Sequence, residues 1–265
     1  MGDLEIQQYL FDLQGYVVLE GLLRPAEVTE LNRLMDAQGL PAPDKDPRFG
    51  AAAGGAPEGP GFLGWGRPFC DLLDHPRVME VLRLRLGDCF RLDRLYGMRQ
   101  RRGMGAGGLH SDYGASSFTA KSEPGVRYLP PETELVNGFV VVGWNLSDTG
   151  PGLGGFCCIP GSHKTQYRIP PAIQKSPEAW PCVVQPKLPA GSAVLFTESL
   201  THGTVGWDGA HERRTLLFKY CVSQMAWSSR RVRPPAEIEL SQRQEALLRE
   251  PADPHRFFPS LFEGG

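Results

Sequence analysis

The sequence predicts a mainly β protein with flanking helices, and three observations support this. Segments with helical spacing of apolar residues are concentrated before residue 89, and segments with strand character follow up to residue 222. Gly and Pro punctuate the strands, and helices come before strands instead of alternating with them, which favours an antiparallel sheet. No internal repeat is present, so one domain over 1–265 is expected. A double-stranded β-helix (jelly-roll, cupin-like) core fits this order.

The N-terminal part of the chain, about 1–88, is expected to supply most of the helices. Its apolar residues recur at the three- and four-residue spacing that places them on one helix face. Proline at the first position of a helix costs no hydrogen bond, so Pro25 and Pro76 can each open one. The predicted elements are a helix over 4–14, a strand over 16–19, a helix from Pro25 to near Gly39, one over 69–73 and one after Pro76.

The segment 40–64 is rich in Gly and Pro and lacks a clear period, so it is predicted to be a long loop. Loops of this length in compact domains often cover a binding site. Phe49, Phe62 and Leu63 lie in it, although a solvated linker has little use for apolar residues. We expect a lid over the mouth of the barrel; a loop packed passively on the surface is the alternative. The loop 113–137 is expected to form the opposite wall.

The second half of the chain is predicted to form the β core, about 89–222, followed by a C-terminal helix and tail over 223–265. Runs rich in β-branched and aromatic residues, bounded by turn residues, mark the strands. Strands are expected over 89–96, 139–146, 156–159, 193–197 and 215–222, a last helix from Pro235, and an extended tail over 257–265.

Composition narrows the function classes. The net charge of −2 argues against a dedicated nucleic-acid surface, and no apolar stretch is long enough for a membrane helix. Residues 1–20 do not resemble a signal peptide, so a cytoplasmic protein is expected. The six cysteines have no CxxC spacing and are expected in the core. Seven arginines between Arg83 and Arg102 indicate either a solvated face or an anion-binding wall.

A possible metal site begins with His110-Ser111-Asp112. On an extended segment the side chains at i and i+2 leave from one face, so His110 and Asp112 can reach the same ion. Such a tripeptide is weak by itself and needs a third ligand. Among the six histidines, His202 directly follows a predicted strand, where a barrel opens. Two histidines and one carboxylate with open positions are typical of non-haem Fe(II) oxygenases.

A cation follows this triad at the start of the last predicted strand. Arg213 lies eleven residues after His202, and a guanidinium beside a metal suits a carboxylate held through two hydrogen bonds. The hydroxyl of Thr204 could add a further hydrogen bond to the same carboxylate. Arg214 should point to the opposite face of the strand. His163, in a Pro-Gly-Ser-His-Lys turn, is expected to be structural, and His75 and His211 are expected at the surface.

The chain resembles the phytanoyl-CoA dioxygenase family of Fe(II)/2-oxoglutarate oxygenases along nearly its whole length. The resemblance implies iron ligands His110, Asp112 and His202, with Arg213 and Thr204 binding 2-oxoglutarate and Trp144 lining the co-substrate. It rests on FDLQGYVVL (11–19), HSD (110–112), GWNLSD (143–148), IPGSHK (159–164), GSAVLF (191–196), HGT (202–204) and Arg213.

The resemblance also implies the reaction. With Fe(II) bound, 2-oxoglutarate and O2 would be consumed, succinate and CO2 released, and an unactivated C–H bond of a small organic or specialised metabolite hydroxylated, desaturated or cyclised. A cupin-like metal-dependent hydrolase or isomerase is one alternative, but it leaves Arg213 unexplained. A non-catalytic binding protein on the same scaffold is another. The expected partner is a small-molecule substrate, with no nucleic acid and no membrane, for a monomer or homodimer.

Overall fold

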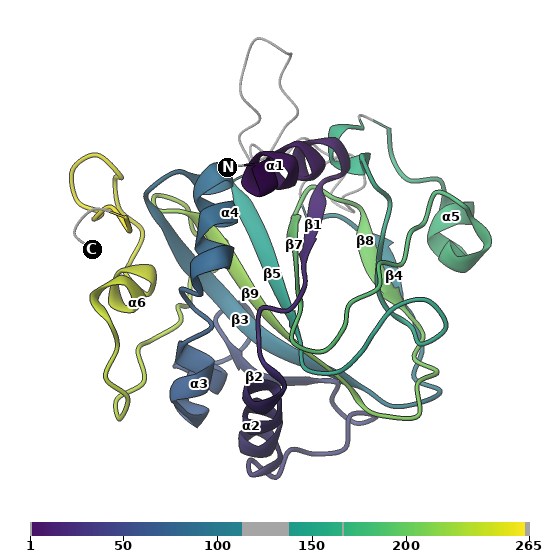
Figure 1. Ribbon diagram of the computed structural model, residues 1–265, viewed down its shortest axis with the longest axis horizontal. Helices are drawn as coiled ribbons and strands as arrows, with labels where there is room; N and C mark the ends of the chain where they lie inside the picture. Colours follow the sequence, from purple (N-terminus) through teal and green to yellow (C-terminus); the bar gives the residue numbers. More distant parts are fainter. Residues whose placement is uncertain (1, 113–137, 166, 263–265) are drawn as a thin grey trace.

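The fold consists of two antiparallel sheets that face each other, with most helices outside the larger one (Figure 1). The computed structural model describes residues 2–112, 138–165 and 167–262. The larger sheet has the order β1 (Tyr16–Leu19), β7 (Ala193–Thr197), β5 (Phe139–Asn145), β9 (Arg213–Val222), β3 (Phe90–Gln100) and β2 (Arg48–Ala52). The smaller sheet has the order β4 (Gly107–His110), β8 (His202–Val205) and β6 (Gly155–Cys158). The predicted jelly-roll class is confirmed.

The longer helices lie near the N-terminus, as the spacing of apolar residues predicted. Each of α2 and α4 begins at a proline, where the missing amide hydrogen costs nothing. The short helix α5 lies beside the three-stranded sheet, and α6 lies at the far side of the molecule (Figure 1). The helices are α1 (Gly2–Gln14), α2 (Pro25–Asp36), α3 (Arg67–Cys70), α4 (Pro76–Leu86), α5 (Pro171–Lys175) and α6 (Gln242–Leu247), with 3-10 turns η1 (Gly61–Trp65), η2 (Ser162–Lys164) and η3 (Pro177–Ala179).

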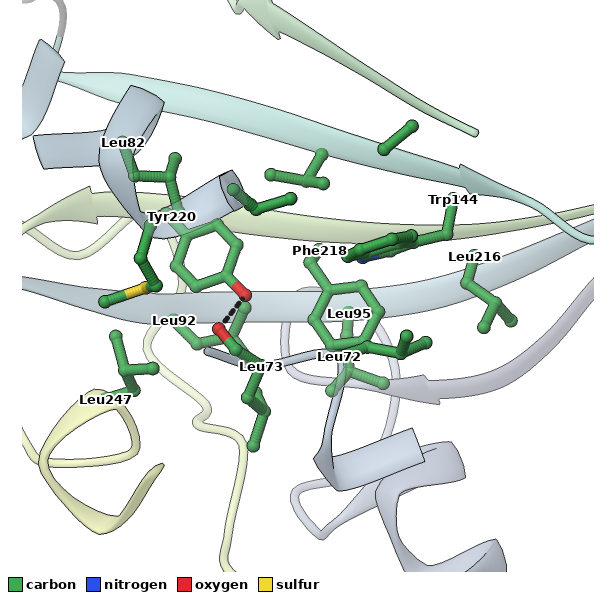
Figure 2. Close-up of a cluster of buried hydrophobic side chains, with 14 of the residues drawn as sticks. Leu72, Leu73, Leu82, Leu92, Leu95, Trp144, Leu216, Phe218, Tyr220 and Leu247 are labelled. Atoms are coloured by element: carbon green, nitrogen blue, oxygen red, sulfur yellow. Dashed lines mark hydrogen bonds between the residues drawn. The ribbon is translucent and has the colours of Figure 1, made fainter. Parts of the chain in front are cut away.

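The larger sheet buries its two faces in different ways. Alternate residues of a strand leave from opposite faces, so β9 contributes Leu216, Phe218 and Tyr220 to the core under the helices. Figure 2 shows these side chains together with Trp144, and the Tyr220 hydroxyl donates a hydrogen bond of 2.8 Å to the carbonyl of Leu73. The other face looks into the barrel, where a second cluster of apolar side chains packs between the sheets: Tyr16, Val141, Phe156, Cys158, Leu188, Val194, Phe196 and Leu200.

A β-bulge at Asp93 changes the alternation along β3. Leu92 pairs with Tyr220 and Arg94 pairs with Lys219, so Asp93 is the extra residue. Its carboxylate forms a fully buried ion pair with Arg91, 3.0 Å between Nη1 and Oδ1, and accepts the amide hydrogen of Trp227. Because of the bulge, Arg94 points into the barrel beside Lys219 while Leu95 points to the helix-covered core.

The segment 40–64 differs from the loop and lid that the sequence predicted. It contains edge strand β2, which pairs with β3, and the turn η1. Phe49, Phe62 and Leu63 are buried in the helix-side core, and the ring of Phe49 stacks on Trp65 with centroids 5.7 Å apart. The lid prediction is wrong for this part, because the apolar residues serve packing and the backbone is fixed by a ladder.

Other predictions were incomplete. The strands β4 and β8 and the helix α5 were not predicted, because each is only four or five residues long and too short to show a period. The last helix begins at Gln242, where Ser241 caps it, and not at Pro235. The described part of the tail forms turns and bends instead of an extended strand.

The remaining composition-based expectations are mostly met. The six cysteines form no disulfide, and four of them are buried. Most arginines between Arg83 and Arg102 pair with acids, but they do not form one solvated face, because Arg91 and Arg99 are buried. The pairs are Arg83 with Asp88, Arg91 with Asp93, Arg99 and Arg101 with Glu212, and Arg102 with Asp208. Within the described ranges, no helix has the length and apolar character required to cross a membrane.

Candidate metal and co-substrate site

Two of the predicted ligands face each other across neighbouring strands of the smaller sheet. His110 ends β4, His202 begins β8, and the two residues are direct partners in the ladder. Their ring centroids are 4.6 Å apart. His202 also lies 4.7 Å, centroid to centroid, from Phe196 of the larger sheet, so the histidine pair is at the inner face of the barrel. The ladder thus brings together two residues that are 92 positions apart.

Both imidazoles are oriented by hydrogen bonds from Nδ1. His110 Nδ1 lies 2.9 Å from the carbonyl oxygen of Gly108, and His202 Nδ1 lies 2.8 Å from that of Leu200. A carbonyl oxygen can only accept, so each Nδ1 carries a hydrogen, and in a neutral ring the lone pair is then on Nε2. Burial, with the neighbouring His110, lowers the pKa of His202 to about 3, so its ring is neutral near pH 7. This is the tautomer that binds a metal through Nε2.

The third predicted ligand, Asp112, lies two residues beyond β4, and its side chain is 24% exposed. Its amide donates to the carbonyl of Glu198, at 3.1 Å. Its Oδ2 atom contacts Lys219 Nζ at 3.1 Å and Arg94 Nη2 at 3.8 Å. Burial opposes ionisation of the carboxyl, but Lys219 and hydrogen bonding outweigh it and hold the pKa of Asp112 well below its usual range. The carboxylate is therefore ionised, as a metal ligand must be.

The two imidazoles are oriented to bind iron, whereas the Asp112 carboxylate, in its present orientation, is not. Over 2–112, 138–165 and 167–262, no three His, Cys, Asp or Glu side chains converge closely enough to hold a metal ion. The histidine pair offers two nitrogen donors in the right tautomer, whereas Asp112 is turned toward Lys219 and Arg94. Asp112 lies near enough to His202 for their charges to interact. The donor set is the one that Fe(II) oxygenases use, with Asp112 having to turn toward the imidazoles.

Arg213 is a buried cation at the start of β9, 4% exposed. Its Nη1 donates to Gln100 Oε1 at 2.6 Å across the β3–β9 ladder, and its Nε has no hydrogen-bond partner among the described residues. Burial lowers its pKa to about 10, so the guanidinium stays charged near neutral pH. A buried charge without a counter-ion is unfavourable, and the described residues give Arg213 no carboxylate partner. The arrangement calls for an anionic ligand.

The surroundings of Arg213 leave room for such an anion. Gly155 of β6 has φ +103°, and a Cβ there would lie 3.5 Å from Arg213 Nε and 3.1 Å from Thr149 Cβ. The hydroxyl of Thr149 is also buried without a partner in the described part of the chain. A glycine at this point keeps the space beside two unsatisfied polar groups open. The dicarboxylate 2-oxoglutarate fits Arg213 through one of its carboxylates.

The other predicted site residues divide into two groups. Thr204 lies two residues after His202 on the same face of β8, partly buried beside Gly107. Trp144, in contrast, does not lie with them: it is fully buried on the helix-covered face, with its ring 5.5 Å from that of His75. The expectation that Trp144 lines the co-substrate is wrong, because even-numbered residues of β5 point away from the barrel interior.

The histidines and Arg214 follow their predicted structural roles, with one exception. His163 is buried in η2, and its Nε2 donates to the carbonyl of Asp12 at 2.9 Å. Arg214 points to the helix side and pairs with Asp36 of α2 at 2.7 Å. His211 is exposed, but His75 is half-buried against Trp144. The wall expected from 113–137 lies outside the described residues.

Three site residues were missed by sequence reasoning: Gln100, Glu198 and Lys219. Gln100 and Lys219 face the barrel because they alternate with core residues along β3 and β9. A polar residue between apolar ones in the last strand, as in Leu-Phe-Lys-Tyr at 217–220, was an available signal for Lys219. Glu198 carries no such signal, since it follows the end of β7 and is brought in by the fold alone.

Comparison with known proteins identifies a family and a shared fold. The family model described as phytanoyl-CoA dioxygenase (PhyH) matches residues 11–215. No curated protein sequence matches the chain. Among solved structures, HygX from Streptomyces hygroscopicus with nickel and 2-oxoglutarate bound has a TM-score of 0.68 at 20% identity, covering 83% of this chain and 88% of its own.

Two enzymes of nogalamycin biosynthesis also share the fold. The non-haem α-ketoglutarate-dependent epimerase SnoN has a TM-score of 0.57 at 18% identity, covering 84% of each chain. The α-ketoglutarate-dependent carbocyclase SnoK has a TM-score of 0.57 at 17% identity, covering 88% of each chain. At these identities the likeness shows a common fold, and the family match covers more than half of the chain.

Proposed function

We propose, from the premise that this chain belongs to the phytanoyl-CoA dioxygenase family of 2-oxoglutarate-dependent oxygenases, that it oxidises a small specialised metabolite. The reacting bond is an unactivated C–H bond, and succinate and CO2 are the co-products. The observation that carries the proposal is the pair His110 and His202, matched across β4 and β8 with both rings in the metal-binding tautomer.

In this proposal His110, Asp112 and His202 hold Fe(II), and Arg213 anchors 2-oxoglutarate. Bound iron supplies the oxidising chemistry, using O2 and the electrons released when 2-oxoglutarate loses CO2. Gly108 and Leu200 fix the rings by accepting their Nδ1 hydrogens. Arg213 neutralises a carboxylate of the co-substrate, and Thr204 adds a hydroxyl near it. Phe156 and Phe196, packed beside His202, keep water away from that side of the site.

Hydroxylation is the proposed outcome, with desaturation or ring formation as other fates of the same substrate radical. The structural neighbours support a specialised metabolite as substrate. One HygX structure contains hygromycin B, and SnoN and SnoK act in nogalamycin biosynthesis. We further propose a cytoplasmic monomer or homodimer that acts without nucleic acid or membrane, supported by a net charge of −2 with no basic excess.

The direct test is anaerobic addition of Fe(II) and 2-oxoglutarate to the metal-free protein, followed by visible absorption. A weak charge-transfer band is expected for the wild type, because the oxoacid chelates the iron. The band should be absent from His202→Ala, which loses a ligand. Wild-type protein that binds Fe(II) but gives no band with 2-oxoglutarate would favour the metal-dependent hydrolase alternative. Succinate release with candidate metabolites then identifies the substrate.

A further inference from the structure

Arg213 is held by the protein through one side of its guanidinium. Its Nη1 donates to Gln100 Oε1 at 2.6 Å, and both side chains are buried. Gln100 Nε2 donates to the carbonyl of Gly105 at 3.2 Å, which fixes the amide with its oxygen toward Arg213. Because an amide is neutral, Gln100 orients the guanidinium without neutralising it. The Nε atom, on the other side, has no hydrogen-bond partner among the described residues.

A second buried polar group lies beside Arg213. Thr149 is 3% exposed, and its Oγ1 has no hydrogen-bond partner within the described ranges, although its backbone exchanges two hydrogen bonds of 2.9 Å with Leu188. A hydroxyl shut off from water in this way is unfavourable unless a ligand satisfies it. Burial raises the pKa of the neighbouring Cys157 thiol to about 11, so Cys157 provides no anion for Arg213 near neutral pH.

Gly155 leaves space between the two unsatisfied atoms. A Cβ at Gly155 would lie 3.5 Å from Arg213 Nε, 3.5 Å from Thr149 Oγ1 and 3.1 Å from Thr149 Cβ. Any larger residue would therefore place a side chain against both the guanidinium and the hydroxyl. The φ angle of +103° also belongs to the region that favours glycine. The missing side chain leaves both polar atoms within reach of one carboxylate group, since each hydrogen bond spans about 2.8 Å.

We propose that Thr149 is a binding residue for the carboxylate of 2-oxoglutarate that Arg213 anchors, in the space that Gly155 leaves open. The inference rests on the proposed function, in which Arg213 binds this co-substrate. Arg213 supplies the charge and its Nε hydrogen, and Thr149 donates its hydroxyl hydrogen to the same carboxylate. One anion thus satisfies two buried groups that have no partner in the described part of the chain.

The test is anaerobic calorimetric titration of 2-oxoglutarate into the protein with Fe(II) present, which measures affinity without turnover. Thr149→Val keeps the branched side chain and removes the hydroxyl. The dissociation constant should rise by roughly 10- to 100-fold, the cost of a lost hydrogen bond to a charged group. The melting temperature without 2-oxoglutarate should equal or exceed that of the wild type, because the variant removes an unsatisfied buried hydroxyl. A merely structural threonine would show the reverse, a lower melting temperature with unchanged affinity.

The matched control is Thr29→Val on α2, where the hydroxyl donates to the carbonyl of Pro25 at 2.8 Å. Its affinity for 2-oxoglutarate should equal that of the wild type. Arg213→Ala, measured in parallel, should lose most of the affinity. If Arg213→Ala binds 2-oxoglutarate like the wild type, the proposed co-substrate site itself fails. If Arg213→Ala loses affinity but Thr149→Val does not, only the role of Thr149 fails.

Two further variants at the same position separate the hydroxyl from the rest of the side chain, and they decide the question should Thr149→Val not fold. Thr149→Ser retains the hydroxyl and should bind 2-oxoglutarate within about threefold of the wild type. Thr149→Ala lacks the hydroxyl and should bind as weakly as Thr149→Val. Equal affinities of the serine and alanine variants would overturn the inference, because the hydroxyl would then contribute nothing to binding.

Discussion

Arg213 and Arg214 are neighbours in sequence but point to opposite faces of β9. Arg213 hydrogen-bonds to Gln100 inside the barrel, and Arg214 pairs with Asp36 on the helix side. The two arginines are therefore a matched pair: one faces the proposed co-substrate site and the other is a structural residue of the same type on the same strand.

The first prediction uses this pair. Arg213→Ala should raise the apparent Michaelis constant for 2-oxoglutarate by roughly 30- to 150-fold, since a charge-assisted pair in a partly dry site contributes about 2–3 kcal/mol. Steady-state succinate release against 2-oxoglutarate concentration measures it. Arg214→Ala should leave that constant within about twofold and lower only the stability. The reverse result would show that the anchor is on the other face.

The second prediction concerns the histidine pair. His110→Ala and His202→Ala should each abolish turnover and sharply weaken Fe(II) binding, since each removes one of two facing nitrogen donors. Anaerobic calorimetry with Fe(II) and succinate assays measure the two effects. His163→Ala is the control, because the His163 ring donates to the Asp12 carbonyl and is not one of the two facing imidazoles, so this variant should keep Fe(II) binding if it folds. Near-normal turnover by His202→Ala would remove the triad assignment.

The third prediction separates Trp144 from the site. Trp144 is fully buried against His75 in the helix-side core, so Trp144→Phe should destabilise the protein by about 1–3 kcal/mol through lost packing. Urea unfolding measures this change. The Michaelis constant for 2-oxoglutarate should stay within about twofold of the wild type. A large rise in that constant, without a stability change, would return Trp144 to the co-substrate wall.

The fourth prediction tests the packing of β2 on β3. A Cβ at Gly97 would lie 2.0 Å from the Phe49 ring, so Gly97→Ala should cost about 1–3 kcal/mol or more by overpacking. Gly55→Ala is the control, since its Cβ meets nothing within 4 Å, and it should change stability by less than about 0.5 kcal/mol. Thermal unfolding distinguishes the two. Equal stabilities would mean that β2 moves freely, as a lid would.

The fifth prediction is a pH dependence of stability from His163. Burial lowers its pKa in the folded protein from 6.5 to about 4. Between these values the unfolded chain binds a proton that the folded protein does not, so stability falls as the pH drops from about 6.5 to 4. The loss amounts to about 3 kcal/mol, and the contribution is intact above pH 6.5. In His163→Gln, the free energy of unfolding measured with urea should change less with pH over this range. An unchanged dependence on pH would show that other groups cause it.

The sequence pattern was sufficient to predict the helices and strands in which buried residues recur at a regular spacing. Alternation predicted that Arg213 and Arg214 diverge. The i, i+2 expectation that His110 and Asp112 share one face stays a prediction, because β4 ends at His110 and Asp112 lies beyond it. The sequence pattern failed to predict strands that form only through pairing with strands distant in the sequence. Four residues such as His202–Val205 form a strand only because β4 and β6 flank them. Gly- and Pro-rich sequence hid β2 for the same reason, since its stability comes from β3 and the aromatic residues around Phe62.

The site residues follow the same division. His110, Asp112, His202 and Arg213 carry chemistry that the sequence displays directly. Lys219 forms ion pairs with both Glu198 and Asp112, which are distant in sequence, so no local motif predicts that these residues lie at the site. Trp144 shows the opposite error, in which a motif suggested a role that the register of β5 rules out: Val142 and Trp144 point toward the helices.

The two-sided character of β9 has an evolutionary consequence. Arg213 and Lys219 lie on one side of the strand, and Leu216, Phe218 and Tyr220 lie on the other. Selection for folding and selection for chemistry therefore act on alternate residues of the ten-residue strand β9. A lineage can change what the barrel oxidises by exchanging inward residues while the outward ones, and the melting temperature that depends on them, stay constant. Laboratory evolution of new substrates should accordingly begin at odd-numbered positions of this strand other than Arg213, the proposed co-substrate anchor.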